Sequence, residues 1–117
     1  MFQQLLGKGL SQKVSLYIPG TVNVNEAASQ ELIDGWVTAA HTFLAGLFGG
    51  ATSLRALGSY IANDGTLVTE NITVIYAYAS KVSNSQILSI LDFVHGLKTE
   101  SGQESIGVEV NGTLYFG

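Results

Sequence analysis

The chain has 117 residues, of which 46% are hydrophobic and 12% are charged, and its formal net charge at pH 7 is −4. This length fits one domain, and the high apolar fraction excludes an intrinsically disordered chain. Only five residues are Lys or Arg, so we expect neither nucleic-acid binding nor attraction to an anionic membrane surface. The chain has no cysteine, which excludes disulfides and thiolate ligands.

Residues 1–12 are predicted to form an extension that precedes the folded core. Apolar side chains in this segment are interrupted by Gly7 and Gly9, so the segment lacks the continuous apolar region of a signal peptide. We therefore expect a cytoplasmic protein with one domain over residues 1–117, whose core occupies 13–117. The mean hydropathy of +0.30, together with the low charge, favours self-association.

The first strand and the first helix are predicted from two different periodicities. Apolar and other side chains alternate over 13–18, which indicates a strand that Pro19 ends. Over about 25–48 the apolar residues recur at helical spacing, which predicts an amphipathic helix with Asn23 or Asn25 as its N-cap.

A central hairpin is predicted from two extended runs, 51–62 and 66–79, that are joined by an Asp-Gly turn. If Asp64 and Gly65 are the two turn residues, the pairing of the strands follows from the turn length. In that register Arg55 and Glu70 share one side of the sheet, about 13 Å apart along the strands.

The last third of the chain predicts a second helix and a second hairpin. Ser83 and Gln86 have the spacing of a capping box, and the helix that follows ends near Gly102. Strands over 104–110 and 113–116 then flank an Asn-Gly turn. The whole order predicts an α+β, ferredoxin-like βαββαβ sandwich. Two helices would cover one face of its antiparallel sheet, and a C-terminal edge strand would be added.

The strand patterns predict a sheet with two apolar faces. Ile72, Val74 and Tyr76 lie on one side of the central strand, and Ile75 and Ala77 lie on the other. A face without helices would therefore need a second cover. We expect that this cover is a second copy of the chain, in a homodimer or a larger homo-oligomer, or that the face forms a ligand cleft. The alternative is that the amino-terminal residues 2–10 fold back over it.

Four polar residues are candidates for lining a small-molecule site in the cleft between helices and sheet: Arg55, Tyr60, Glu70 and Glu104. The competing interpretations are a solvated edge charge for Arg55 and core filling for the tyrosine. The two histidines have no metal-binding spacing and no cysteine or carboxylate cluster beside them. We therefore expect no metal and no cofactor.

Four motifs carry a family resemblance: FGGAT at 48–52, GSY at 58–60, DGTLVTE at 64–70 and GQESIGVEV at 102–110. In order and spacing they resemble an uncharacterised bacterial and mobile-element family of small ferredoxin-like proteins, over roughly residues 14 to 116. No function is assigned to that family. The resemblance directs attention to four residues at the matching positions, which are Tyr60, Glu70, Gln103 and Glu104. This chain has Tyr60 where many relatives have Trp.

Three classes of function remain open from the sequence. The first is a homo-oligomeric structural or binding module without catalysis. The alternative is a small-molecule binder or cofactor-independent enzyme of the dimeric ferredoxin-like type, for which Arg55→Ala or Glu70→Gln would abolish ligand binding but leave folding intact. The third is an interaction protein that presents an edge strand or a tyrosine-rich face to a different partner, and it would capture another chain.

Overall fold

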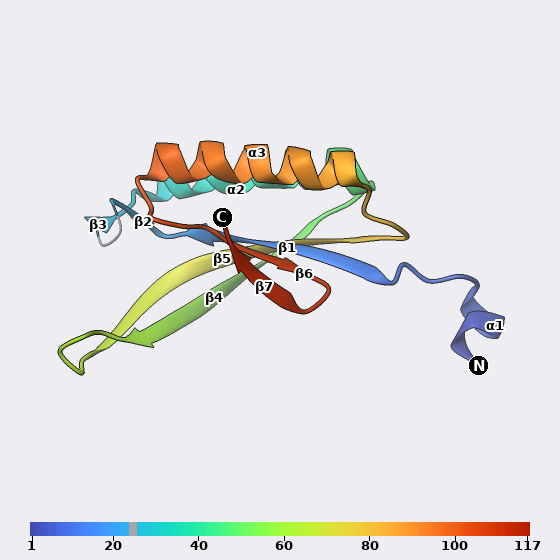
Figure 1. Cartoon of the computed structure of the whole chain (residues 1–117), viewed down its shortest axis with the longest axis horizontal. Helices are drawn as coiled ribbons and strands as arrows, with labels where there is room; N and C mark the ends of the chain where they lie inside the picture. Colours follow the sequence, from blue (N-terminus) through green and yellow to red (C-terminus); the bar gives the residue numbers. More distant parts are fainter. Residues whose placement is uncertain (24–25) are drawn as a thin grey trace.

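A computed structural model describes residues 1–23 and 26–117. Within these residues, five strands form an antiparallel sheet in the order β4-β5-β1-β6-β7, and β2 pairs with β3 in a separate sheet. The two long helices, α2 and α3, lie on one face of the larger sheet (Figure 1). The elements are α1 (Phe2–Leu6), β1 (Gln12–Pro19), β2 (Thr21–Val22), β3 (Glu26–Ala27), α2 (Gln30–Phe48), β4 (Thr52–Ile61), β5 (Leu67–Ala79), α3 (Asn84–Ser101), β6 (Gly107–Val110) and β7 (Thr113–Phe116).

The predicted two-helix, ferredoxin-like sandwich is wrong for this chain, because the structure contains a third helix and a second sheet. The third helix is α1, in the segment expected to be an extension that precedes the folded core. The second sheet pairs β2 with β3, and β3 occupies residues where the first long helix was expected to begin. That helix begins only at Gln30, because Ser29 caps it by accepting a hydrogen bond from the Leu32 backbone. Of the two proposed caps, Asn23 precedes β3 and Asn25 lies outside the described residues.

The central hairpin forms as expected, but its register differs by one residue. The connection is a three-residue loop, Asn63–Gly65, in which Gly65 has a φ of +87°. The strands consequently pair Gly58 with Glu70 and Arg55 with Thr73. Since a shift of one residue exchanges the faces of a strand, Arg55 and Glu70 lie on opposite sides of the sheet, and the prediction that they share one side is wrong.

Asp64 stabilises this loop through two hydrogen bonds. Thr66 Oγ1 and the Thr66 backbone N–H donate to its carboxylate at 2.6 and 3.0 Å, and these bonds lower the pKa of Asp64 below its ordinary value of 3.8. The stabilisation is therefore present above pH 3.8 and is lost as the pH falls through the lowered pKa. Thr66→Val should raise this pKa toward 3.8, as measured by a carboxyl NMR titration. An unchanged pKa would contradict this account.

The core lies between the helices and the sheet, and it is built by alternate residues of the strands. Leu16 and Ile75, which pair across β1 and β5, are fully buried together with Leu44 of α2 and Val94 of α3. The expected capping box is present at the start of α3, where Ser83 and Gln86 exchange hydrogen bonds of 3.2 and 2.9 Å. Within the described residues, no helix combines the length and apolar character needed to cross a bilayer.

Candidate functional site

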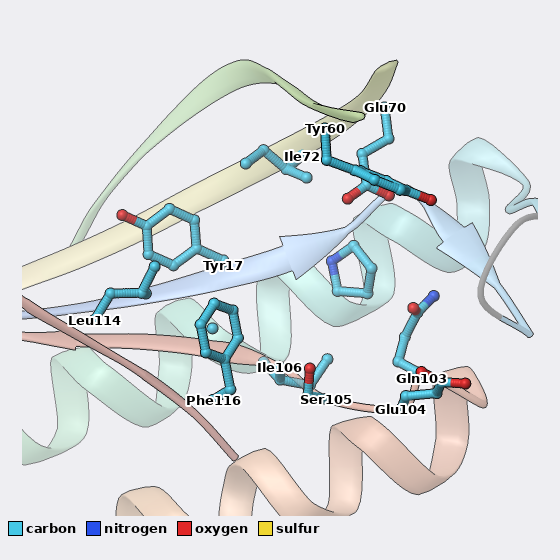
Figure 2. A pocket seen from close by; sticks show the side chains of 12 residues that line it. Tyr17, Tyr60, Glu70, Ile72, Gln103, Glu104, Ser105, Ile106, Leu114 and Phe116 are labelled. Carbon is cyan, nitrogen blue, oxygen red and sulfur yellow. The ribbon is translucent and has the colours of Figure 1, made fainter. Parts of the chain in front are cut away.

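The face of the sheet opposite the helices carries a pocket of about 470 Å³, which lies within the usual range for small-molecule sites. Tyr17 and Ile72 are on this face because they alternate with core residues such as Leu16 and Ile75. Figure 2 shows the side chains that line the pocket. They come from β1, β4, β5, β6, β7 and the α3–β6 loop, and are Tyr17, Pro19, Tyr60, Glu70, Ile72, Gln103, Glu104, Ser105, Ile106, Gly107, Leu114 and Phe116.

The central hairpin places Tyr60 and Glu70 side by side at one end of the pocket. Gly58 pairs with Glu70, so Tyr60, two residues further along β4, lies on the same side of the sheet as Glu70. Figure 2 shows the Tyr60 ring beside the Glu70 carboxylate. Glu70 is half-buried, whereas the tyrosine is 54% exposed.

The loop after α3 brings Gln103 and Glu104 to the same end. Gly102 ends the helix with a φ of +68°, and the backbone N–H of Asn23 donates to the Ser101 carbonyl at 2.9 Å. The Gln103 amide nitrogen then donates to both the backbone oxygen and Oγ1 of Thr21, each at 2.9 Å. These contacts fix the loop against β2 and the residue that follows it.

The pocket is therefore divided into a polar end and an apolar end. Tyr60, Glu70, Gln103 and Glu104 gather at the polar end, and Tyr17, Leu114 and Phe116 gather at the other (Figure 2). Among the described residues that line the pocket, none is Lys or Arg. A site with two carboxylates and no basic side chain attracts a cationic ligand, and aromatic and aliphatic side chains suit a flat apolar ring.

Three of the four candidate residues come together here, and the fourth does not. Tyr60, Glu70 and Glu104 line this pocket, but on the helix-free face rather than between helices and sheet as expected. Arg55 lines a different cavity with Gln30 and Thr73, at the start of α2. The separation follows from the hairpin register, since Arg55 and Glu70 point to opposite sides of the sheet.

The apolar end was not identified from the sequence. Tyr17 and Pro19 are on the first strand, and Leu114 and Phe116 are on the last. They meet because β6, which pairs with β7, also pairs with β1. In the sequence, Ser15 and Tyr17 alternate with apolar residues, and this pattern indicated that both lie on the face of β1 opposite the core. Nothing in the sequence indicated that the carboxyl-terminal hairpin would lie beside that strand.

Comparison with known proteins relates the fold to one class of solved structures. No protein-family model and no curated protein matches the sequence. A phage SAM lyase in complex with S-methyl-5'-thioadenosine is similar over 94% of this chain and 91% of its own, with a TM-score of 0.63 and 19% identity. A phage SAM lyase in the apo state is similar over 92% and 88%, with a TM-score of 0.60 and 18% identity. The chain thus has a SAM lyase-like α+β fold.

Proposed function

We propose that this protein binds S-adenosylmethionine in the pocket on the helix-free face and cleaves it to S-methyl-5'-thioadenosine. The observation that carries the proposal is the composition of the pocket, in which two carboxylates lie beside an aromatic end and no basic side chain is present among the described lining residues. The similarity in fold to phage SAM lyases supports it. Both favour the small-molecule alternative over a purely structural module.

The two ends of the pocket match the two parts of this substrate. The α-ammonium group stays cationic throughout the reaction, so it suits the polar end, which contains the carboxylates of Glu70 and Glu104. The thioadenosyl part carries a flat base and a sulfur that changes from a sulfonium to a neutral thioether. It suits the apolar end with Tyr17 and Phe116, because an apolar environment disfavours the charged form relative to the neutral one.

The atoms and charges of the cleavage balance within the substrate, so the reaction needs neither water nor a second reactant. The bond between sulfur and the γ-carbon of the amino acid part breaks, and both electrons stay on sulfur. The substrate's own carboxylate oxygen forms the new bond to that carbon, which gives a five-membered lactone. No Lys or Arg among the described lining residues pairs with this carboxylate, so it remains available as the nucleophile.

The test is incubation of the purified protein with S-adenosylmethionine, followed by chromatography and proton NMR of the products. We expect S-methyl-5'-thioadenosine and the lactone in equal amounts. The matched control is Glu100→Gln, a carboxylate on α3 outside this pocket, which should leave the rate unchanged. Absence of the thioadenosine product would contradict the proposed reaction, and olefinic protons in place of a lactone would contradict the internal attack.

We also propose that a second copy of the chain covers much of the helix-free face. Large side chains on this face are exposed, among them Leu54 of β4 and Phe116 of β7, at 57% and 71%. The alternative cover is not in place, because α1 lies beyond one end of the sheet (Figure 1) and Leu5 is 72% exposed. A monomer rarely exposes such a surface. Native mass spectrometry should therefore give a dimer or a larger assembly, and a bare monomer would contradict this proposal.

A further inference from the structure

The polar end of the pocket contains a side chain whose orientation is set by a residue outside it. Gln103 is half-buried, and its amide nitrogen donates to two oxygens of Thr21, the backbone carbonyl and Oγ1, both at 2.9 Å. Thr21 is the first residue of β2, and it is not among the residues that line the pocket. The neighbouring contact from Asn23 to Ser101 holds β2 against the end of α3.

These contacts determine which way round the amide group lies. A backbone carbonyl can only accept a hydrogen bond, so the atom of Gln103 that faces it must be the NH₂ group. The other atom, Oε1, is then turned away from Thr21, and Figure 2 shows it on the pocket side. Within the described residues, no hydrogen bond involves this oxygen.

The orientation adds a third acceptor to the polar end, where the Tyr60 hydroxyl can either donate or accept. Glu70 and Glu104 contribute carboxylates, and Gln103 contributes a carbonyl oxygen in place of an amide that could turn to donate. Acceptors that line the same pocket, two of them carboxylates, favour a ligand group that donates several hydrogen bonds and carries positive charge. A primary ammonium group has these properties, whereas a carboxylate or phosphate has neither.

We infer that the Thr21 hydroxyl makes Thr21 a positioning residue: with the backbone carbonyl it holds the Gln103 amide so that Oε1 accepts a hydrogen bond from the ammonium group of the ligand. This inference rests on the proposed function, because it specifies how the same pocket recognises the amino acid part of the substrate. Thr21 itself does not touch the ligand. Its backbone carbonyl selects the NH₂ group of the amide, and its Oγ1 is the second acceptor that limits rotation of the amide.

The test compares a ligand that carries the ammonium group with a ligand that lacks it. S-Adenosylhomocysteine carries the ammonium and cannot undergo the cleavage of a sulfonium, and S-methyl-5'-thioadenosine lacks the whole amino acid part. Thr21→Val removes Oγ1 with little change of shape, and Thr21→Ser keeps it. By isothermal titration calorimetry we expect Thr21→Val to bind S-adenosylhomocysteine about fivefold more weakly, as for loss of one hydrogen bond, with thioadenosine binding unchanged. Thr21→Ser should restore wild-type affinity for both.

Each other outcome overturns a defined part of the account. If Thr21→Val weakens the binding of both ligands equally, or of neither, the Thr21 hydroxyl does not position the amide and the inference is wrong, while the proposed function stands. If Thr21→Ser behaves like Thr21→Val, the hydroxyl is not the group responsible, and the inference is wrong. If the wild-type protein binds neither ligand, the proposed function fails, and this inference fails with it. Circular dichroism of both variants verifies that they are folded.

Discussion

Replacement of Glu70 by glutamine should weaken the binding of S-adenosylhomocysteine by about 30-fold and reduce cleavage of S-adenosylmethionine at least as much. A hydrogen bond to a charged group contributes roughly 1.5–3 kcal/mol, and about 2 kcal/mol corresponds to this factor. We take a value within this range because Glu70 is only half-buried, so solvent screens its charge. Binding of S-methyl-5'-thioadenosine, which has no ammonium group, should change by less than about threefold, since it loses no ionic hydrogen bond.

Two measurements make this prediction specific. Glu100→Gln removes a carboxylate from the groove between α2 and α3, and it should alter neither affinity. The fold of Glu70→Gln should be intact, because the side chain makes no ion pair within the described residues and is not part of the core. If Glu70→Gln binds S-adenosylhomocysteine as tightly as the wild type, the polar end does not recognise the ammonium group.

Replacement of Gly102 by alanine should lower both stability and ligand affinity. Gly102 has a φ of +68°, and a Cβ atom there would lie 3.2 Å from the Asn23 backbone nitrogen and closer still to its side-chain oxygen. The left-handed conformation alone costs a residue with a Cβ about 1–2 kcal/mol. The displaced loop would also move Gln103, so we expect weaker binding of S-adenosylhomocysteine.

The matched control for this prediction is a glycine-to-alanine change inside the helix that Gly102 ends. Gly96 lies inside α3, and a Cβ there meets nothing within 4 Å. Gly96→Ala should therefore stabilise the protein by about 0.5–1 kcal/mol through its helix propensity. Urea denaturation measures both free energies of unfolding. Equal stability of Gly102→Ala and the wild type would show that the contact with Asn23 imposes no constraint.

Local signals in the sequence identified most elements but not their arrangement. The capping box at Ser83 and the glycine after α3 were found, because each rests on contacts within a few residues. The hairpin at Asp64 was also found, yet its register was wrong by one residue, because Asp-Gly occurs both in two-residue turns and in the three-residue loop seen here. The start of α2 was misplaced for a different reason, because Ser29 and not an earlier asparagine is the cap.

The candidate site was predictable only in part, because it depends on how distant strands are paired. Tyr60, Glu70 and Glu104 were singled out, and they line one pocket. Arg55 was included through the incorrect register, which placed it on the side of Glu70. The apolar end was missed because β7 is connected to β1 only through β6. The sequence contains no local signal for the pairing of β1 with β6, which are nearly a hundred residues apart.

The most direct measurement of the central claim is an NMR titration of the isotopically labelled protein with two ligands. S-Methyl-5'-thioadenosine should shift the amide signals around Tyr17, Ile72 and Gly107. S-Adenosylhomocysteine should shift these and also the signals of Glu70 and of the loop 102–105. The signals around Arg55 should be unaffected, because it lines a different cavity. An absence of shifts at millimolar concentrations of both ligands, or shifts confined to the surroundings of Arg55, would contradict the account.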